Sequence, residues 1–176
     1  LVSLITAVSA VVGLIALIVM VNRYSYALTN FGFAQGDIGK AMFEFADVRS
    51  SLRAAIGYDD QDAIDLVVQQ HKESKAAFLE NFAKIENTIV SKSGRETYDN
   101  IASTLDSYWE LDDKIMNQGA SVDREECRVA QEWAINEMAP AYNSIYEDLD
   151  SLLEVKVSEG QKLSRTLMIL SVVLVI

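Results

Sequence analysis

Two interleaved apolar ladders with a seven-residue repeat run through residues 31–55. The first ladder is Phe31, Ile38, Phe45 and Leu52, and the second is Ala34, Ala41, Val48 and Ala55. Such a repeat brings its apolar positions onto one stripe only when the segment is helical. The ladders therefore predict a long helix that packs side-on against partner helices, and they argue against a strand.

Two arginines flank this stripe. Arg49 follows the ladder residue Val48, and Arg53 lies four residues further, one turn along nearly the same face. In a dimer in which two copies of this helix meet, the flank is where a contact between subunits or a bound anion would lie.

The charge of the chain is unevenly placed along its 176 residues, a length that fits about one domain. No charged residue precedes Arg23 or follows Arg165, so the net charge of -11 belongs to the segment between them. Because phosphates need a basic surface, this acidic segment disfavours nucleic acid and anionic lipid as partners. The single cysteine, Cys127, cannot form a disulfide within the chain.

Apolar runs stand at both ends of the charged segment. Residues 1–21 contain no charge and would span roughly 30 Å as a helix, which matches a bilayer core, so we expect a first transmembrane helix. A secretory signal peptide is the alternative, but the run is longer than the usual apolar region of such a peptide and lacks a convincing cleavage site. Residues 164–176 are too few to cross a bilayer, and we expect them to begin a second transmembrane helix.

Residues 22–163 carry the three-and-four spacing of apolar residues that is typical of amphipathic helices. No glycine pair or proline separates Val21 from Phe31, so the membrane helix should continue into the ladder helix and end at Gly57. The next helices are expected at about 61–90, from the Ser93-to-Glu96 capping box to about 118, and beyond 123. Their expected N-caps are Asp60, Ser93 and either Ser121 or Asp123. The expected fold is all-α, an antiparallel up-down-up-down four-helix bundle continuous with two transmembrane helices, the second one truncated.

Polar and helix-breaking residues interrupt the predicted stripes. His71 and Lys75 lie in the stripe of the second helix, where a structural role, by snorkelling or by pairing with a carboxylate, is favoured over a pH- or ligand-sensitive notch. Pro140 should kink the fourth helix, because proline removes a backbone hydrogen bond. The inward-facing positions of that helix are expected to be Ile135, Met138, Tyr142, Ile145, Leu149 and Leu152.

The sequence offers no motif for enzyme chemistry. His71 is the only histidine and has no glutamate at the spacing of a carboxylate-bridged metal pair. The sequence also lacks a haem-attachment motif, a zinc-protease motif, a nucleophile elbow and a phosphate loop. We therefore expect no catalytic residue, no metal and no cofactor.

Two membrane helices that bracket four antiparallel amphipathic helices resemble the ligand-binding region of bacterial transmembrane chemoreceptors, the methyl-accepting chemotaxis proteins. The likeness covers nearly the whole chain. Its local anchor is residues 45–53, which are similar to the Arg-x-x-x-Arg segment with which amino-acid chemoreceptors hold ligand carboxylates across a homodimer interface. Arg49 and Arg53 match its two arginines. Glu44 stands where aspartate-binding members have a further arginine, and Ala141 follows Pro140 where they have a threonine.

The resemblance implies a homodimer in the bacterial plasma membrane, with residues 22–163 as a sensor domain on the extracytoplasmic side. It implies a small anionic or zwitterionic ligand, an amino acid or an organic acid. The implied signalling partners are a cytoplasmic chemotaxis kinase and its adaptor, reached through regions outside this chain. Membrane lipid surrounds the two transmembrane helices in this arrangement.

Helix geometry places Pro140 level with the arginines. Arg49 lies 27 residues after Asn22, and Pro140 lies 25 residues before Arg165, so in antiparallel helices they stand at similar heights above the membrane. Polar residues near Pro140 should therefore face the arginines. The candidate ligand-binding residues are Arg49, Arg53, Asn136, Glu137, Tyr142 and Asn143. The alternative for the arginines is surface salt bridges with Glu44, Asp47 or another acidic helix, which contribute little to stability.

Three functions are compatible with these features. In the first, a ligand at the dimer interface shifts the fourth helix along its axis by about 1–2 Å, and the second membrane helix carries the shift to the kinase. In the second, the same module controls a histidine kinase or a cyclic-nucleotide enzyme. In the third, the chain is a membrane-anchored structural bundle without a ligand.

Overall fold

The computed structural model describes residues 2–175, and every regular element in that range is helical. The elements are α1 (Val2–Ala27), the π-helical turn η1 (Leu28–Gly32), α2 (Phe33–Ala55), α3 (Gln61–Glu86), α4 (Lys92–Gly119), α5 (Arg124–Trp133), the π-helical turn η2 (Ala134–Met138) and α6 (Ala139–Val175). Leu1 and Ile176, the outer ends of the two expected membrane helices, lie outside the described residues. The all-α prediction is confirmed.

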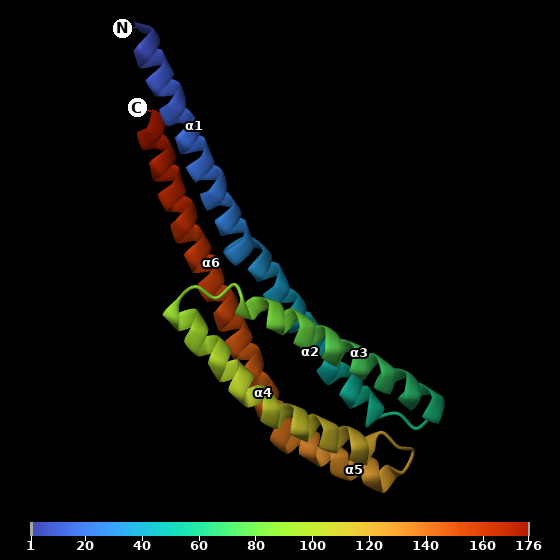
Figure 1. Cartoon of the computed structure of the whole chain (residues 1–176). Coiled ribbons are helices and arrows are strands. Elements are labelled where there is room, and N and C mark those ends of the chain that lie inside the picture. Colours follow the sequence, from blue (N-terminus) through green and yellow to red (C-terminus); the bar gives the residue numbers. More distant parts are fainter. Residues whose placement is uncertain (1, 176) are drawn as a thin grey trace.

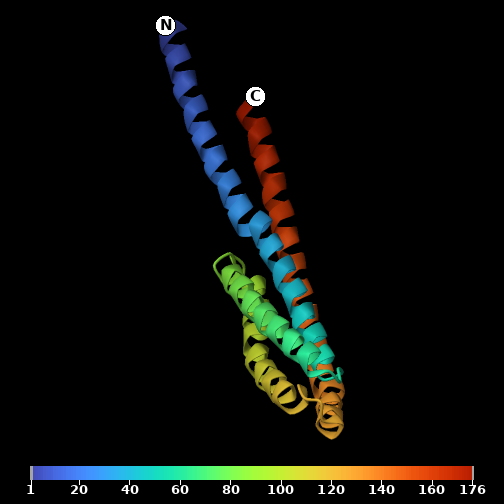
Figure 2. The same ribbon diagram turned by 90° about the vertical axis from the view of Figure 1, so that its right-hand side faces the viewer.

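Four rods make up the bundle, and they alternate in direction (Figure 1). The first rod is α1, η1 and α2 without interruption, and the fourth is α5, η2 and α6. The α3 helix returns beside α2, and α4 runs beside the fourth rod (Figure 1). Figure 2 shows that the two long rods extend past the α3–α4 turn on the same side, with both chain ends there. The predicted up-down-up-down order and the continuous first rod are confirmed.

The apolar ladders of α2 lie inside this single chain. All eight ladder residues are buried, with exposed fractions between 0% and 6%. Phe45 contacts one aromatic ring from each of the other three rods, with ring centroids at 5.1 Å for Phe78, 5.0 Å for Tyr108 and 4.9 Å for Tyr142. Aromatic rings at these separations attract one another in addition to burying apolar area. The ladder therefore holds the four rods together, and a second copy of the chain would have to use another face of α2.

The inward position predicted at Ile135 is wrong. Its side chain is 69% exposed, whereas Ala134 is half-buried and Met138 is buried. The cause is η2, because a π-helical turn holds one residue more than an α-helical turn and rotates the preceding residues relative to those that follow. Across η2 the inward-facing residues are four positions apart in the sequence: Ala130, Ala134 and Met138.

The helix starts agree with the predicted caps at two of three places. The Asp60 side chain accepts a hydrogen bond from the Ala63 backbone N–H at 2.9 Å, and the Asp123 side chain accepts from the first turn of α5. In α4 the cap is Ser91, two residues before the predicted Ser93, and its Oγ accepts from Gly94 N–H at 3.1 Å. The first rod ends at Ala55, two residues before the predicted Gly57.

The fourth rod bends where Pro140 and η2 lie close together. Pro140 follows the last residue of η2 by two positions, and α5 is inclined to α6 in Figure 1. Proline has no N–H, so the carbonyl of Asn136, inside η2, lacks its α-helical donor. The predicted kink is therefore present, and a π-helical turn accompanies it.

The N-terminal part of the first rod has the character of a membrane helix. The large apolar side chains from Val11 to Val21 are 37–61% exposed in the chain. Within the part of the chain that the structure describes, one helix is long and apolar enough to cross a membrane, and its apolar portion is near the N-terminus. This helix suggests membrane anchoring. The second membrane helix stays a prediction, although α6 continues as a helix to Val175.

Candidate functional site

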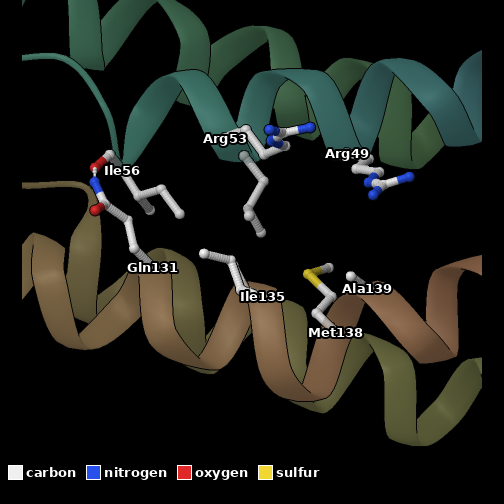
Figure 3. Close-up of a pocket in the computed structure, with 9 residues that line it drawn as sticks. Arg49, Arg53, Ile56, Gln131, Ile135, Met138 and Ala139 are labelled. Carbon is white, nitrogen blue, oxygen red and sulfur yellow. Dashed lines mark hydrogen bonds between the residues drawn. The ribbon is translucent and has the colours of Figure 1, made fainter.

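A pocket of about 470 Å³ lies between α2 and the bend of the fourth rod. Figure 3 shows Arg49 and Arg53 on α2 and, facing that helix from the fourth rod, the side chains of Ile135 and Met138. The complete lining is Arg49, Leu52, Arg53, Ile56, Gln131, Ala134, Ile135, Met138 and Ala139. Its volume falls in the range of small-molecule sites.

The η2 turn forms much of one wall of this pocket. Ala134, Ile135 and Met138, three of the lining residues, belong to η2. Because η2 rotates Ile135 away from the core, this large apolar side chain lies on the pocket wall. Single π-helical turns within α-helices frequently occur at functional sites, since they weaken the local hydrogen bonding and redirect side chains.

Arg49 and Arg53 have no carboxylate partner within 4.0 Å among the described residues. The three arginines of α4 and α5 are each paired. Their partners are Glu86 for Arg95 at 3.3 Å, Asp59 for Arg124 at 2.9 Å and Glu125 for Arg128 at 2.7 Å. The surface salt bridges with Glu44 or Asp47 that were the alternative for the two pocket arginines are not formed in this structure.

Arg49 is held in place by an aromatic ring. Its guanidinium carbon lies 4.2 Å from the centroid of the Tyr142 ring, the geometry of a cation–π contact. Burial raises the pKa of the Tyr142 hydroxyl, and the positive charge of Arg49 opposes that rise. Arg53, one turn further along α2, is exposed to solvent. One arginine is therefore fixed at the pocket edge and the other is free to turn toward an anion.

The structure brings together some of the candidate ligand residues and separates others. Arg49 and Arg53 line the pocket, and Tyr142 lies under Arg49. Asn136, Glu137 and Asn143 are exposed and are not among the lining residues. Pro140 adjoins the lining residue Ala139, so the predicted level of the bend relative to the arginines is confirmed.

Sequence reasoning missed the apolar side of the pocket because it searched for polar residues near Pro140. Gln131, Ile135 and Ala139 recur at four-residue spacing and lie on one wall. That spacing was a usable signal. Gln131 also ties the wall to α2, because its Nε2 donates to the backbone oxygen of Ile56 at 2.8 Å.

A second polar cluster lies between α3 and α4. The buried carboxylate of Asp112 accepts from His71 Nε2 at 2.9 Å and from Lys75 Nζ at 3.3 Å, and Lys75 also reaches Asp113 at 2.7 Å. His71 Nδ1 lies 3.1 Å from the backbone oxygen of Val48 on α2. His71 and Lys75 thus pair with carboxylates, one of the two structural roles expected for them, and this cluster joins three rods.

A groove of about 410 Å³ adjoins this cluster and is lined in part by His71, Lys72 and Lys75. Among the side chains that the structure describes, no group of three or more His, Cys, Asp or Glu residues is placed to hold a metal ion.

Comparison with known proteins bears on the fold and the role of the bundle. No curated protein and no solved structure shows significant similarity to the chain. The family model described as a four helix bundle sensory module for signal transduction matches residues 1–166, which include the first three rods and most of the fourth. The four-helix bundle observed here is the architecture that this description names. The chain belongs to the family of four-helix-bundle sensory modules for signal transduction.

Proposed function

We propose that this sensory module belongs to a bacterial transmembrane chemoreceptor of the methyl-accepting type and binds a small carboxylate between α2 and the bend of the fourth rod. The observation that supports this most strongly is the pair of unpaired arginines, Arg49 and Arg53, at a pocket in a chain of net charge -11. A guanidinium matches a carboxylate geometrically and can donate two parallel hydrogen bonds to it.

The position of the pocket supports signalling along the rods. One wall belongs to α2, which is continuous with the N-terminal apolar helix, and the other belongs to η2, which is continuous with α6. A ligand that binds one relative position of these rods better than another shifts the population toward it. Axial helix shifts of about 1–2 Å are sufficient for such switches. The bend at η2 is where the fourth rod has the fewest regular α-helical hydrogen bonds to resist such a shift.

A second copy of the chain would fit the outward face of α2. A side-chain carbon added at Gly36 or Gly39 would meet no atom within 4 Å, and Phe33 and Phe43 on this side are 65% and 64% exposed. Glycines let two helix backbones approach closely, and exposed large apolar side chains mark interaction surfaces. We propose that the homodimer forms through this face, with Arg53 at its edge.

The bundle lies on the extracytoplasmic side of the bacterial plasma membrane in this proposal, and α6 leads to a chemotaxis kinase and its adaptor. Asn136, Glu137 and Asn143 remain candidates for ligand contact at the dimer interface. The same module can instead precede a histidine kinase or a cyclic-nucleotide enzyme, and the identity of the output domain would distinguish these alternatives.

A ligand screen tests the proposal. The full chain in lipid nanodiscs would be heated with each of a set of amino acids and organic acids, and its melting temperature recorded. A ligand at a hundred times its Kd stabilises the folded chain by about 2.7 kcal/mol, a readily measured shift. At least one carboxylate should raise the melting temperature, and the rise should vanish in the Arg49→Ala, Arg53→Ala double variant.

Arg128→Ala is the matched control, because it removes an arginine from the same bundle that is paired and lies outside the pocket. It should retain the ligand response. If no compound stabilises the chain, or if the double variant responds as the unaltered chain does, the ligand site is wrong and the ligand-free structural bundle is the better account.

A further inference from the structure

The pocket combines a cationic edge with an apolar lining. Besides Arg49, Arg53 and Gln131, the lining is apolar: Leu52, Ile56, Ala134, Ile135, Met138 and Ala139. Ile135 is the most exposed of the large apolar side chains in this set, at 69%. A ligand with a hydrocarbon body would cover this surface and remove it from water.

The same lining offers almost nothing to an ammonium group. No Asp or Glu lines the pocket. The carboxylates of Glu137 and Asp47 lie outside it. Gln131 is the only uncharged polar lining residue, and its Nε2 is already engaged with Ile56. The side-chain oxygen of Gln131 is therefore the single side-chain acceptor on the wall.

An α-amino acid would place its ammonium close to its carboxylate, beside the two guanidinium groups. The ammonium would then lose water without gaining a carboxylate and would be repelled by two like charges. A dicarboxylate avoids that repulsion but sets its second charge against the apolar wall. A carboxylate with an apolar body meets neither penalty.

We infer that the pocket selects monocarboxylates with a compact apolar body over α-amino acids and over dicarboxylates. This inference rests on the proposed carboxylate site. The arginines hold the carboxylate, and Ile135, the exposed member of the large apolar lining residues, contacts the hydrocarbon. The ligand class is thus an aliphatic or aromatic monocarboxylate.

Isothermal titration calorimetry of the full chain in nanodiscs at neutral pH tests this with matched probes. Isocaproate is the monocarboxylate, and leucine has the same carbon skeleton with an added ammonium. Isocaproamide lacks the charge, and succinate replaces the apolar end by a second carboxylate. Isocaproate should bind at least about tenfold tighter than each of the other three, the effect expected of one charged hydrogen-bonding group.

Two variants assign the contacts. Ile135→Ser should weaken isocaproate binding and leave any succinate binding unchanged, because it removes only apolar surface. Arg53→Ala should weaken isocaproate binding, whereas Arg128→Ala should not.

The outcomes separate this inference from the proposed function. If leucine or succinate binds as tightly as isocaproate and Arg53→Ala weakens it, the selectivity inference is overturned and the carboxylate site stands. If isocaproamide equals isocaproate, or Arg53→Ala has no effect, the arginine–carboxylate site itself is overturned. Absence of binding by all four probes overturns the selectivity inference, and the wider ligand screen then decides the proposed function.

Discussion

Two grooves on the same bundle contain basic residues. In one groove these residues are paired with carboxylates, and in the other they are not. In the α3–α4 groove, His71 and Lys75 are matched by Asp112 and Asp113 within the chain. In the pocket between α2 and the fourth rod, no described carboxylate matches Arg49 or Arg53. Charge matched within the chain stabilises the fold, whereas unmatched charge beside a cavity is available to a ligand.

The largest effect is expected at Asp112. Its side chain is 0% exposed, and among the described residues it carries the only carboxylate in contact with His71. Asp112→Ala leaves two basic groups without their buried partner, so the free energy of unfolding should fall by about 3–5 kcal/mol. Denaturant unfolding followed by circular dichroism measures it. Asp113→Ala is the control, because Asp113 is 67% exposed and its ion pair should contribute less than about 1 kcal/mol. Equal effects at the two positions would show that burial of the matched charge is not what stabilises this groove.

A smaller effect is expected at Gly119, which determines how closely α4 approaches the pocket. A side-chain carbon at this position would overlap Ala130 Cβ and lie 2.7 Å from Ile56 Cγ2. Gly119→Ala should therefore destabilise the chain by about 1–3 kcal/mol. In the dissociated monomer, Gly36→Ala should instead stabilise the fold by about 0.5–1 kcal/mol, because within one chain Gly36 is in an exposed part of a helix with open space around it. Thermal unfolding of both variants measures the difference, and a Gly119→Ala variant as stable as Gly36→Ala would contradict the packing seen here.

The pocket arginines should contribute little to the fold. Arg49→Ala loses a cation–π contact with Tyr142, which contributes about 0.5–1 kcal/mol. Arg53→Ala should change the free energy of unfolding by less than about 0.5 kcal/mol, as exposed substitutions usually do. The same unfolding experiment without ligand measures both. A loss above about 2 kcal/mol for Arg53→Ala would mean that Arg53 has a partner that stabilises the fold, and the contrast between the two grooves would fail.

The smallest effect is a pH dependence at Lys156, a buried charge that belongs to neither groove. Its Nζ donates to the backbone oxygens of Asn30, in η1, and Thr88, and burial lowers its pKa from the ordinary 10.5. The unfolded chain then binds more protons between the lowered pKa and 10.5, so the free energy of unfolding should rise with pH through that window. Lys156→Met removes this contribution.

The free energy of unfolding of the unaltered chain minus that of Lys156→Met should increase as pH rises from neutral toward 10.5. The buried tyrosines act in the opposite direction at high pH, because burial raises the pKa of Tyr98, Tyr108 and Tyr142, but they are present in both proteins. A difference that stays constant with pH would show that Lys156 is not desolvated.

The contrast between the grooves also explains what could be predicted from the sequence. The ladder through Phe45 predicted the first rod and its buried face, because a seven-residue apolar repeat has one helical solution. Pairing of His71 was predictable from its place in an apolar stripe. Its partner Asp112 was not predictable. Asp112 directly follows the apolar Leu111, and only the packing of three rods decides which of these two side chains is buried.

The pocket was predictable in position and not in composition. Arg49 and Arg53 and the level of Pro140 followed from helix periodicity and rise. The exposure of Ile135 did not follow from them, because η2 adds one residue to a turn and no pattern of side chains predicts such a turn. The apolar wall, and with it the inferred ligand class, therefore needed the structure.

A structure of the full chain with a bound monocarboxylate tests the central claim most directly. The carboxylate oxygens should lie about 2.7–2.9 Å from guanidinium nitrogens of Arg49 or Arg53, with the hydrocarbon against Ile135. A carboxylate bound instead beside Lys72 and Lys75 in the α3–α4 groove, with both arginines unoccupied, would contradict it.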